Sequence, residues 1–164
     1  MRILKSLIIL TIVIGVVTLN SCKKDKKTPA SGSMSATIGG TVTSFSKSTV
    51  VLTGTANGAN FTTIQGNATD GSTMSLTIYG ALTAGTTYTT QDPDPTNEPV
   101  VLYVLGSDSY LNEVNNPSVS IKITGLSSSS IQGTFSATIT DITAGANHGN
   151  AKVITNGQFN VPRQ

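Results

Sequence analysis

Three closely spaced strand patterns constrain this chain more than any other feature. Residues 49–56, 59–69 and 72–80 alternate β-branched or apolar side chains with small polar ones. Asn57-Gly58 and Asp70-Gly71 separate them, and both pairs favour two-residue type I′ turns because these residue types tolerate positive φ angles. Two such turns in succession predict an antiparallel meander. The apolar face of its third strand consists of Met74, Leu76 and Ile78.

The rest of the chain after residue 33 shows the same alternation of β-branched and small polar residues, and no amphipathic helix is indicated after residue 22. Val100–Leu105 is apolar on both faces, which predicts a strand in the middle of a sheet. A brief edge strand is predicted at Tyr110-Leu111, and a final hairpin is predicted around Asn156-Gly157. Further strands are predicted at 86–91, 119–124, 131–140, 151–155 and 158–161.

The fold class predicted from these patterns is all-β. We expect one antiparallel β-sandwich with consecutive hairpins and roughly eight to ten strands. A closed, lipocalin-like β-barrel is the alternative, and it would enclose a ligand cavity.

The start of the chain has the layout of a lipoprotein leader. Arg2 and Lys5 precede an apolar run over residues 7–19, which is too short to cross a hydrocarbon core of about 30 Å but suits a signal peptide. A small residue, Ser21, then precedes Cys22, the only cysteine. This arrangement predicts cleavage before Cys22 and attachment of a diacylglycerol to its thiol. The domains expected are therefore a lipoprotein signal peptide (1–21), a lipidated flexible tether (22–33) and a single all-β domain (34–164).

Charge is distributed unevenly along the chain. Of its 10 basic and 8 acidic residues, cleavage would remove Arg2 and Lys5 and leave eight of each sign. Residues 23–27 hold four lysines and Asp25, so the chain from Thr28 onward carries a net charge of −3. A weakly acidic body without basic clusters argues against nucleic acid as a partner. The lysines would lie beside anionic lipid head groups, or would only keep the tether extended and soluble.

Several short segments resemble a family of small uncharacterised lipoproteins from the Bacteroidetes. They are the leader, Met34-Ser35-Ala36-Thr37-Ile38-Gly39-Gly40, Ile121-Lys122-Ile123-Thr124, Ile131-Gln132-Gly133-Thr134-Phe135 and Ile154-Thr155-Asn156-Gly157-Gln158-Phe159-Asn160-Val161. Family members often have a tryptophan near the position of Phe45, which this chain lacks. The resemblance implies an outer-membrane, lipid-anchored β-domain, and it supplies no catalytic or binding residues. Lys24-Asp25 begins the charge pattern of surface-exported members and Lys26 breaks it, so both the cell surface and the periplasmic face stay open.

No catalytic constellation is recognisable in the sequence, so we expect a protein that is not an enzyme. A Ser-His-Asp triad would require His148, the only histidine, and no Gly-x-Ser-x-Gly motif is present. A zinc site needs three or four nitrogen or sulfur ligands, which the chain does not offer. Paired carboxylates for glycoside hydrolysis cannot be placed from sequence, which makes a hydrolase the least favoured reading.

Two weak binding sites follow from residue type. Asp92, Asp94, Asn97 and Glu98 could offer hard oxygen ligands to Ca²⁺, joined by Asp108, although the loop lacks EF-hand spacing and an ordinary proline-rich turn is favoured. No other cofactor is expected. Tyr79, Tyr88 and Tyr110 could stack on sugar rings or anchor a protein.

The function expected from sequence is an envelope-anchored, non-catalytic binding module for a glycan, protein or small ligand. The alternative is a structural or assembly component of the cell envelope.

Overall fold

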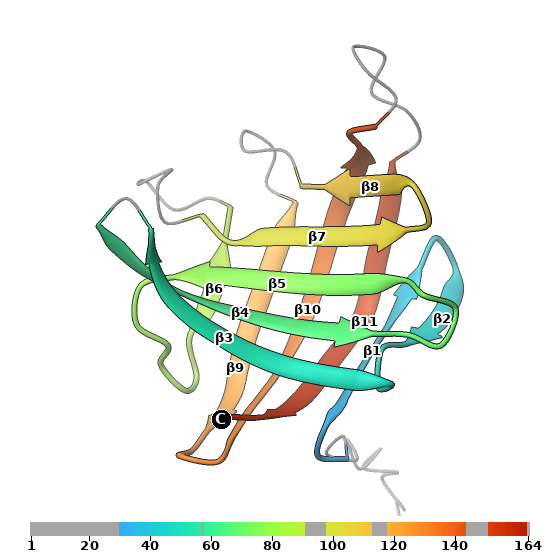
Figure 1. Ribbon diagram of the computed structural model, residues 1–164. Helices are drawn as coiled ribbons and strands as arrows, with labels where there is room; N and C mark the ends of the chain where they lie inside the picture. Colours follow the sequence, from blue (N-terminus) through green and yellow to red (C-terminus); the bar gives the residue numbers. More distant parts are fainter. Residues whose placement is uncertain (1–29, 57, 91–97, 113–117, 144–150, 164) are drawn as a thin grey trace, which may run out of the picture.

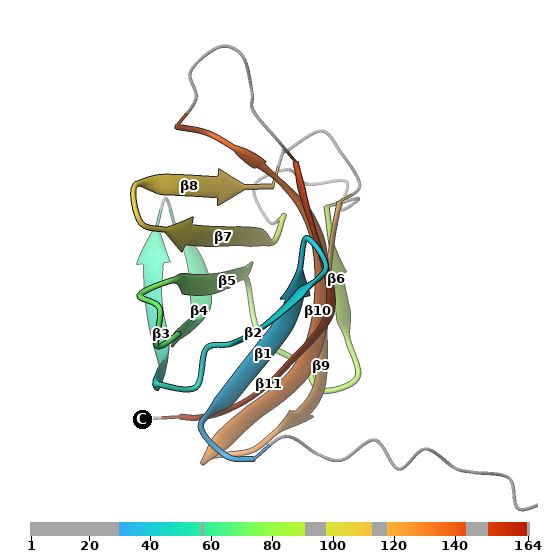
Figure 2. The ribbon, with the colours of Figure 1, turned by 90° about the vertical axis from the view of Figure 1, so that its right-hand side faces the viewer.

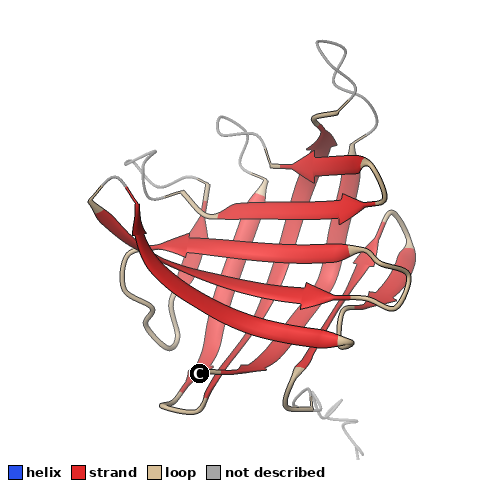
Figure 3. Ribbon diagram, in the orientation of Figure 1, coloured by secondary structure: helices blue, strands red, loops and turns tan. Residues whose placement is uncertain are grey.

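The computed structural model describes residues 30–56, 58–90, 98–112, 118–143 and 151–163, and every regular element in this part of the chain is a strand (Figure 3). The strands are β1 (Ser33–Ile38), β2 (Thr41–Ser44), β3 (Ser48–Ala56), β4 (Ala59–Asn67), β5 (Thr73–Tyr79), β6 (Thr87–Thr89), β7 (Val100–Leu105), β8 (Asp108–Leu111), β9 (Val119–Leu126), β10 (Ser130–Asp141) and β11 (Lys152–Pro162).

The strands form two facing layers (Figures 1 and 2). The front layer has the order β8-β7-β5-β4-β3, and the rear layer has the order β2-β1-β11-β10-β9-β6. Figure 1 shows the strands of the two layers crossing each other steeply. This is the orthogonal form of sheet packing, in which a strand at the corner passes from one sheet to the other.

That corner strand is β10. Most of its length pairs with β9 and β11 in the rear layer, whereas Thr140 and Asp141 pair with Leu111 and Tyr110 of β8. The result is one curled antiparallel sheet whose hydrogen-bonded path ends at β2 and β3. The predicted all-β class is confirmed as a sandwich-like half-barrel, and the described strands do not close into a complete barrel.

Apolar side chains fill the space between the layers. The predicted inward residues Met74, Leu76 and Ile78 of β5 are 0% exposed. Ile64 lies beside Leu76 in the same layer, and Ile121 belongs to β9 of the rear layer, and both are buried as completely. Burying one such side chain stabilises a fold by about 1.5–3 kcal/mol. All of the buried apolar residues belong to one cluster, so both layers share a single core.

Three of the four phenylalanine rings rest on a glycine, and the fourth phenylalanine approaches one with its Cβ and backbone. Phe135 and Phe159 lie directly across the β10–β11 ladder from Gly157 and Gly133, and a Cβ built on either glycine would come within 2.6 Å of the opposite ring. Phe61 covers Gly54 in the same way across the β3–β4 ladder, where the closest approach would be 2.7 Å. A Cβ on Gly66 would lie 2.8 Å from Phe45 Cβ. Glycine therefore makes room for bulky rings in a chain that has no tryptophan.

The predicted meander is present, with one change at a turn. Ala56 pairs with Ala59, as expected for a two-residue connection through Gly58, whose φ is 82°. The β4–β5 ladder instead ends at Asn67 and Thr73, and the Gly71 amide donates a hydrogen bond to the Ala68 carbonyl. Only Gly71 of the Asp70-Gly71 pair has positive φ, which indicates a type I turn followed by a glycine bulge rather than a type I′ turn.

The predicted hairpin at Asn156-Gly157 is wrong. β11 runs continuously from Lys152 to Pro162, with β10 on one side and β1 on the other. Its register shifts against both neighbours beside these two residues, and Asn156 has φ 52°. The positive φ that the pair supplies is used in a β-bulge, because a strand paired on both sides cannot fold back on itself.

Two further expectations change. Tyr110 and Leu111 lie in β8, which is paired on both sides and is not an edge strand. A hairpin that sequence reasoning missed joins β1 to β2 through Gly39 and Gly40, with Ile38 paired to Thr41. Val100–Leu105 forms β7, between β5 and β8, as predicted for an interior strand.

Candidate functional site

The outward side of β3, β4, β5 and β7 is the most distinctive surface of the domain, and we call it the front face. Burial alternates along β4 and β5, so that one side of each strand lies in the core and the other faces outward. In many antiparallel sheets such an outward side is polar and charged. The described side chains on this face include no charged group, and seven are large apolar or aromatic ones: Val50, Leu52, Phe61, Tyr79, Val100, Leu102 and Val104.

Register places these side chains next to one another. Phe61 of β4 is paired with Gly54 on one side and with Tyr79 on the other, so its ring covers the glycine and borders the tyrosine. In the next row Leu52, which is 49% exposed, is paired with Thr63. The Oγ1 atoms of Thr63 and Thr77 are 2.8 Å apart and share a hydrogen bond. The front face thus combines apolar contact area with hydroxyl groups, a mixture that suits contact with sugars and with protein surfaces.

Of the three tyrosines predicted to stack on a ligand, only Tyr79 lies on the front face. Tyr88 lies on β6 in the rear layer, and its hydroxyl donates to the Ala81 carbonyl and accepts from the Thr83 amide, each at 3.0 Å. Those two bonds fix the loop before β6.

Tyr110 belongs to the core. It is 7% exposed, its ring centroid lies 5.9 Å from that of Tyr103, and Lys152 Nζ lies 4.7 Å from its centroid. Because the neighbouring ring and the ammonium cover it, Tyr110 leaves no ring face for a ligand. The stacking surface predicted from Tyr79, Tyr88 and Tyr110 is therefore not a single platform.

The calcium prediction falls largely outside the described residues, which exclude Asp92, Asp94 and Asn97. Glu98 is described and buried at 9% exposure, and its Oε2 has no hydrogen-bond partner. Asp108 begins β8, at the far end of β7 from Glu98, so it does not join that residue. No group of three or more histidine, cysteine or acidic residues comes together within the described ranges. Calcium binding stays a prediction.

A small polar cluster at the β4–β5 turn was missed by sequence reasoning. The backbone amide and the hydroxyl of Ser72 both donate to Asp70 Oδ1, at 2.9 and 2.7 Å. These bonds hold the pKa of Asp70 below its ordinary value of 3.8, and burial raises the pKa of nearby Tyr103 above 10.0. A carboxylate with a lowered pKa is a weak base, so the cluster stabilises a turn rather than activating Ser72 as a nucleophile. Asp-Gly-Ser in the sequence is the signal that could have indicated this side-chain turn.

The remaining predicted groups lie outside the described residues. They are Cys22 and His148, so neither lipidation nor a histidine-dependent triad has structural support or contradiction. None of the described segments forms a helix that is long and apolar enough to cross a membrane. Comparisons with protein-family models, with curated proteins and with solved structures found no match.

Proposed function

We propose that this protein is a lipid-anchored, non-catalytic binding module of the bacterial cell envelope, and that its front face contacts the ligand. The leader and Cys22 support the anchor, and the outward apolar row around Phe61 and Tyr79 supports binding. An apolar surface without charge is uncommon on the outside of a soluble domain and commonly marks an interaction site. Because apolar side chains fill the interior, the ligand is a glycan or a protein surface rather than a small molecule between the layers.

Cys22 is tested by metabolic labelling. Cells given a labelled fatty acid should incorporate it into the wild-type chain, and Cys22→Ala should accumulate as an unlabelled precursor of higher mass. Label in the Cys22→Ala protein would contradict the anchor. Protease accessibility on intact cells, beside a periplasmic control, would then place the domain on the surface or inside.

Binding is tested on the mature chain with an array of envelope and host glycans and with neighbouring envelope proteins. A ligand of the native state should raise the melting temperature in proportion to its concentration. Tyr79→Ala should weaken its binding by about tenfold, the cost of losing one well-placed aromatic contact. The control is Thr134→Ala, on the exposed outward side of the rear layer. Equal binding by both variants would contradict the front face as the contact surface.

An assembly role is the second candidate, and the edge of the front layer favours it. β3 ends the hydrogen-bonded path, and its nine residues include no charged residue and no proline. Charged residues and prolines on an edge strand normally discourage pairing with another chain, and β3 lacks both. Thr55→Cys, at an exposed position on β3, should form specific cross-links to an envelope partner if this edge pairs with it. Cross-linking no stronger than that of Thr138→Cys in the rear layer would contradict the assembly role.

A further inference from the structure

One end of the domain holds the point where the tether begins, and we call it the tether end. It consists of residues 30–33, the β9–β10 turn at Ser127–Ser130, and Arg163. Hydrogen bonds fix these segments together, because the Gly32 amide donates to the Asn160 carbonyl and the Arg163 amide donates to the Ser129 carbonyl. Figures 1 and 2 both show the start of β1, the β9–β10 turn and the end of β11 at the same end of the rear layer.

The side chains of the tether end suit phosphate. Ser127, Ser128 and Ser129 are exposed, and the Ser127 hydroxyl accepts hydrogen bonds from the amides of Ser129 and Ser130 at 3.2 and 3.0 Å. Arg163 Nη1 donates to the Ser127 carbonyl at 3.2 Å, which holds the guanidinium over the turn. A guanidinium has five N–H donors, so the remaining ones are available to a phosphate oxygen.

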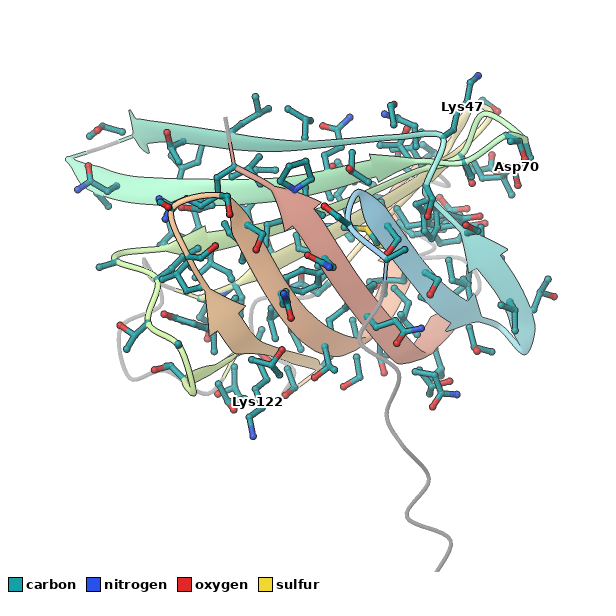
Figure 4. All side chains as sticks on the ribbon, turned by 90° about the horizontal axis from the view of Figure 1, so that it is seen from below. Lys47, Asp70 and Lys122 are labelled. Atoms are coloured by element: carbon teal, nitrogen blue, oxygen red, sulfur yellow. The ribbon has the colours of Figure 1, made fainter. Side chains whose placement is uncertain are left out.

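Acidic groups lie away from this end. The described acidic residues are Asp70, Glu98, Asp108 and Asp141, and none belongs to the segments that form the tether end. Asp141 ends β10, the strand that Ser130 begins at the tether end. Figure 4 looks onto the tether end, where Lys122 projects outward from the rear layer, and it shows Lys47 and Asp70 at the same side of the view. At the opposite end Lys152 begins β11 where Asp141 ends β10, so the two charges offset each other there, whereas Arg163 at the tether end has no acidic residue in the same segments. A bilayer of anionic lipid would therefore attract the tether end more strongly than the opposite one.

The length of the tether favours the same orientation. Seven residues lie between Cys22 and Ala30, and the eight Cα–Cα steps that join them reach at most about 29 Å when fully extended. The 12 residues of β10 span about 36 Å at the usual rise per residue. If the far end of β10 lay on the membrane, the tether would have to be close to fully extended to span the length of this curved strand.

We propose that the tether end lies against the phospholipid head groups of the leaflet that holds the anchor, with Arg163 and the Ser127–Ser130 turn in contact with lipid phosphate. The ends of β6 and β10 then point away from the membrane, and β8 lies on the side of the front layer that is farther from it (Figure 1). This orientation rests on the proposed lipidation of Cys22, and the front face is left open along the side of the domain.

The test uses acylated protein reconstituted into vesicles of phosphatidylethanolamine and phosphatidylglycerol that contain a shallow spin-labelled quencher lipid. Acylation blocks the thiol of Cys22, so a fluorophore can be placed on a new cysteine alone. Ser128→Cys reports on the tether end, and Ala151→Cys, at an exposed position before β11, reports on the opposite end. Quenching at position 128 should exceed quenching at position 151 by at least about threefold, since quenching of this kind falls off within a few ångströms. Equal or reversed quenching would overturn the orientation.

Charge reversal tests the phosphate contact. Arg163→Glu should reduce quenching at position 128 by about half or more, whereas Lys122→Glu, the same change on the exposed outward side of β9, should leave it unaltered. An unchanged signal with Arg163→Glu, or an equal loss with Lys122→Glu, would overturn the contact. Fatty-acid labelling of the same preparation separates the two proposals, because an unlabelled Cys22 contradicts the anchor itself, and a labelled Cys22 with equal quenching contradicts only the orientation.

Discussion

At the scale of single residues, the glycines opposite phenylalanine should be the positions least tolerant of substitution. A Cβ at Gly133 would lie 2.3 Å from Phe159 Cζ and 2.4 Å from the Lys122 carbonyl oxygen, and backbone cannot move aside as a flexible side chain can. Gly133→Ala should therefore lower the free energy of unfolding by about 2–3 kcal/mol, the upper range for overpacking. Gly125→Ala is the matched control, because its nearest neighbour would be Gln132 Oε1 at 3.4 Å. Urea unfolding measures both, and equal losses would contradict the packing argument.

The Asn112 side chain supplies hydrogen bonds to the backbone of β7 and of the residue before it. It is 5% exposed, its Oδ1 accepts from the Val101 amide at 2.7 Å, and its Nδ2 donates to the Pro99 carbonyl at 3.2 Å. These bonds extend the β7–β8 ladder beyond the last residue of β8. Asn112→Ala would leave the Val101 amide buried without a partner and should destabilise the fold by about 1–3 kcal/mol. Asn60→Ala, at an exposed position whose side chain accepts one bond from Thr55, should cost less than half as much in the same urea experiment.

At the scale of elements, the β4–β5 turn gives a pH-dependent prediction. Hydrogen bonds from Ser72 lower the pKa of Asp70 below 3.8, so the native state favours the charged carboxylate. A lowered native pKa contributes stability above pH 3.8, and this contribution is lost as the pH falls through the native value. Ser72→Ala should move the pKa of Asp70 back toward 3.8, as followed by NMR titration of the carboxyl carbon, with Asp70→Asn identifying the resonance. A pKa that stays low in Ser72→Ala would show that the Ser72 hydroxyl is not its main cause.

The same elements show how far local sequence could specify the fold. Alternation in 72–80 and 119–124 correctly placed Met74 and Ile121 in the core, because a strand with one buried face must repeat every second residue. Asn57-Gly58 and Asn156-Gly157 carry the same local signal, yet one is a hairpin and the other a bulge. Both pairs favour a positive φ angle because of their residue types. Whether that angle forms a turn or a bulge depends on whether other strands pair on both sides, as β1 and β10 do beside Asn156-Gly157. That arrangement is decided only in the assembled sheet. The front face likewise could not be predicted from the sequence, because the Phe61–Tyr79 and Phe61–Gly54 pairs depend on the register between strands.

At the scale of the whole molecule, the shared core and the passage of β10 through both layers predict a single cooperative unfolding transition. β10 pairs with β9 and β11 in the rear layer and with β8 at the corner, so loss of either layer exposes the apolar side chains of the other. Far-ultraviolet circular dichroism reports on all strands, and fluorescence in this tryptophan-free chain comes from tyrosine, including Tyr103 and Tyr110 beside the corner. The two signals should give coincident urea transitions, as two-state unfolding requires.

Substitutions in either layer should then shift that one transition. Gly133→Ala acts in the rear layer and Asn112→Ala beside the front layer, and each should lower the midpoint of both signals by the same amount. Because the neighbours of Gly133 are Phe159 and Lys122 and the hydrogen-bond partners of Asn112 are Val101 and Pro99, the two positions share no neighbour among these, and their effects should add in the double variant to within about 0.5 kcal/mol. A tyrosine transition that moves with Asn112→Ala alone, while circular dichroism divides into two steps, would mean that the layers unfold separately. The curled sheet would then be two stacked sheets joined at a corner, and front-face binding would stabilise only one of them.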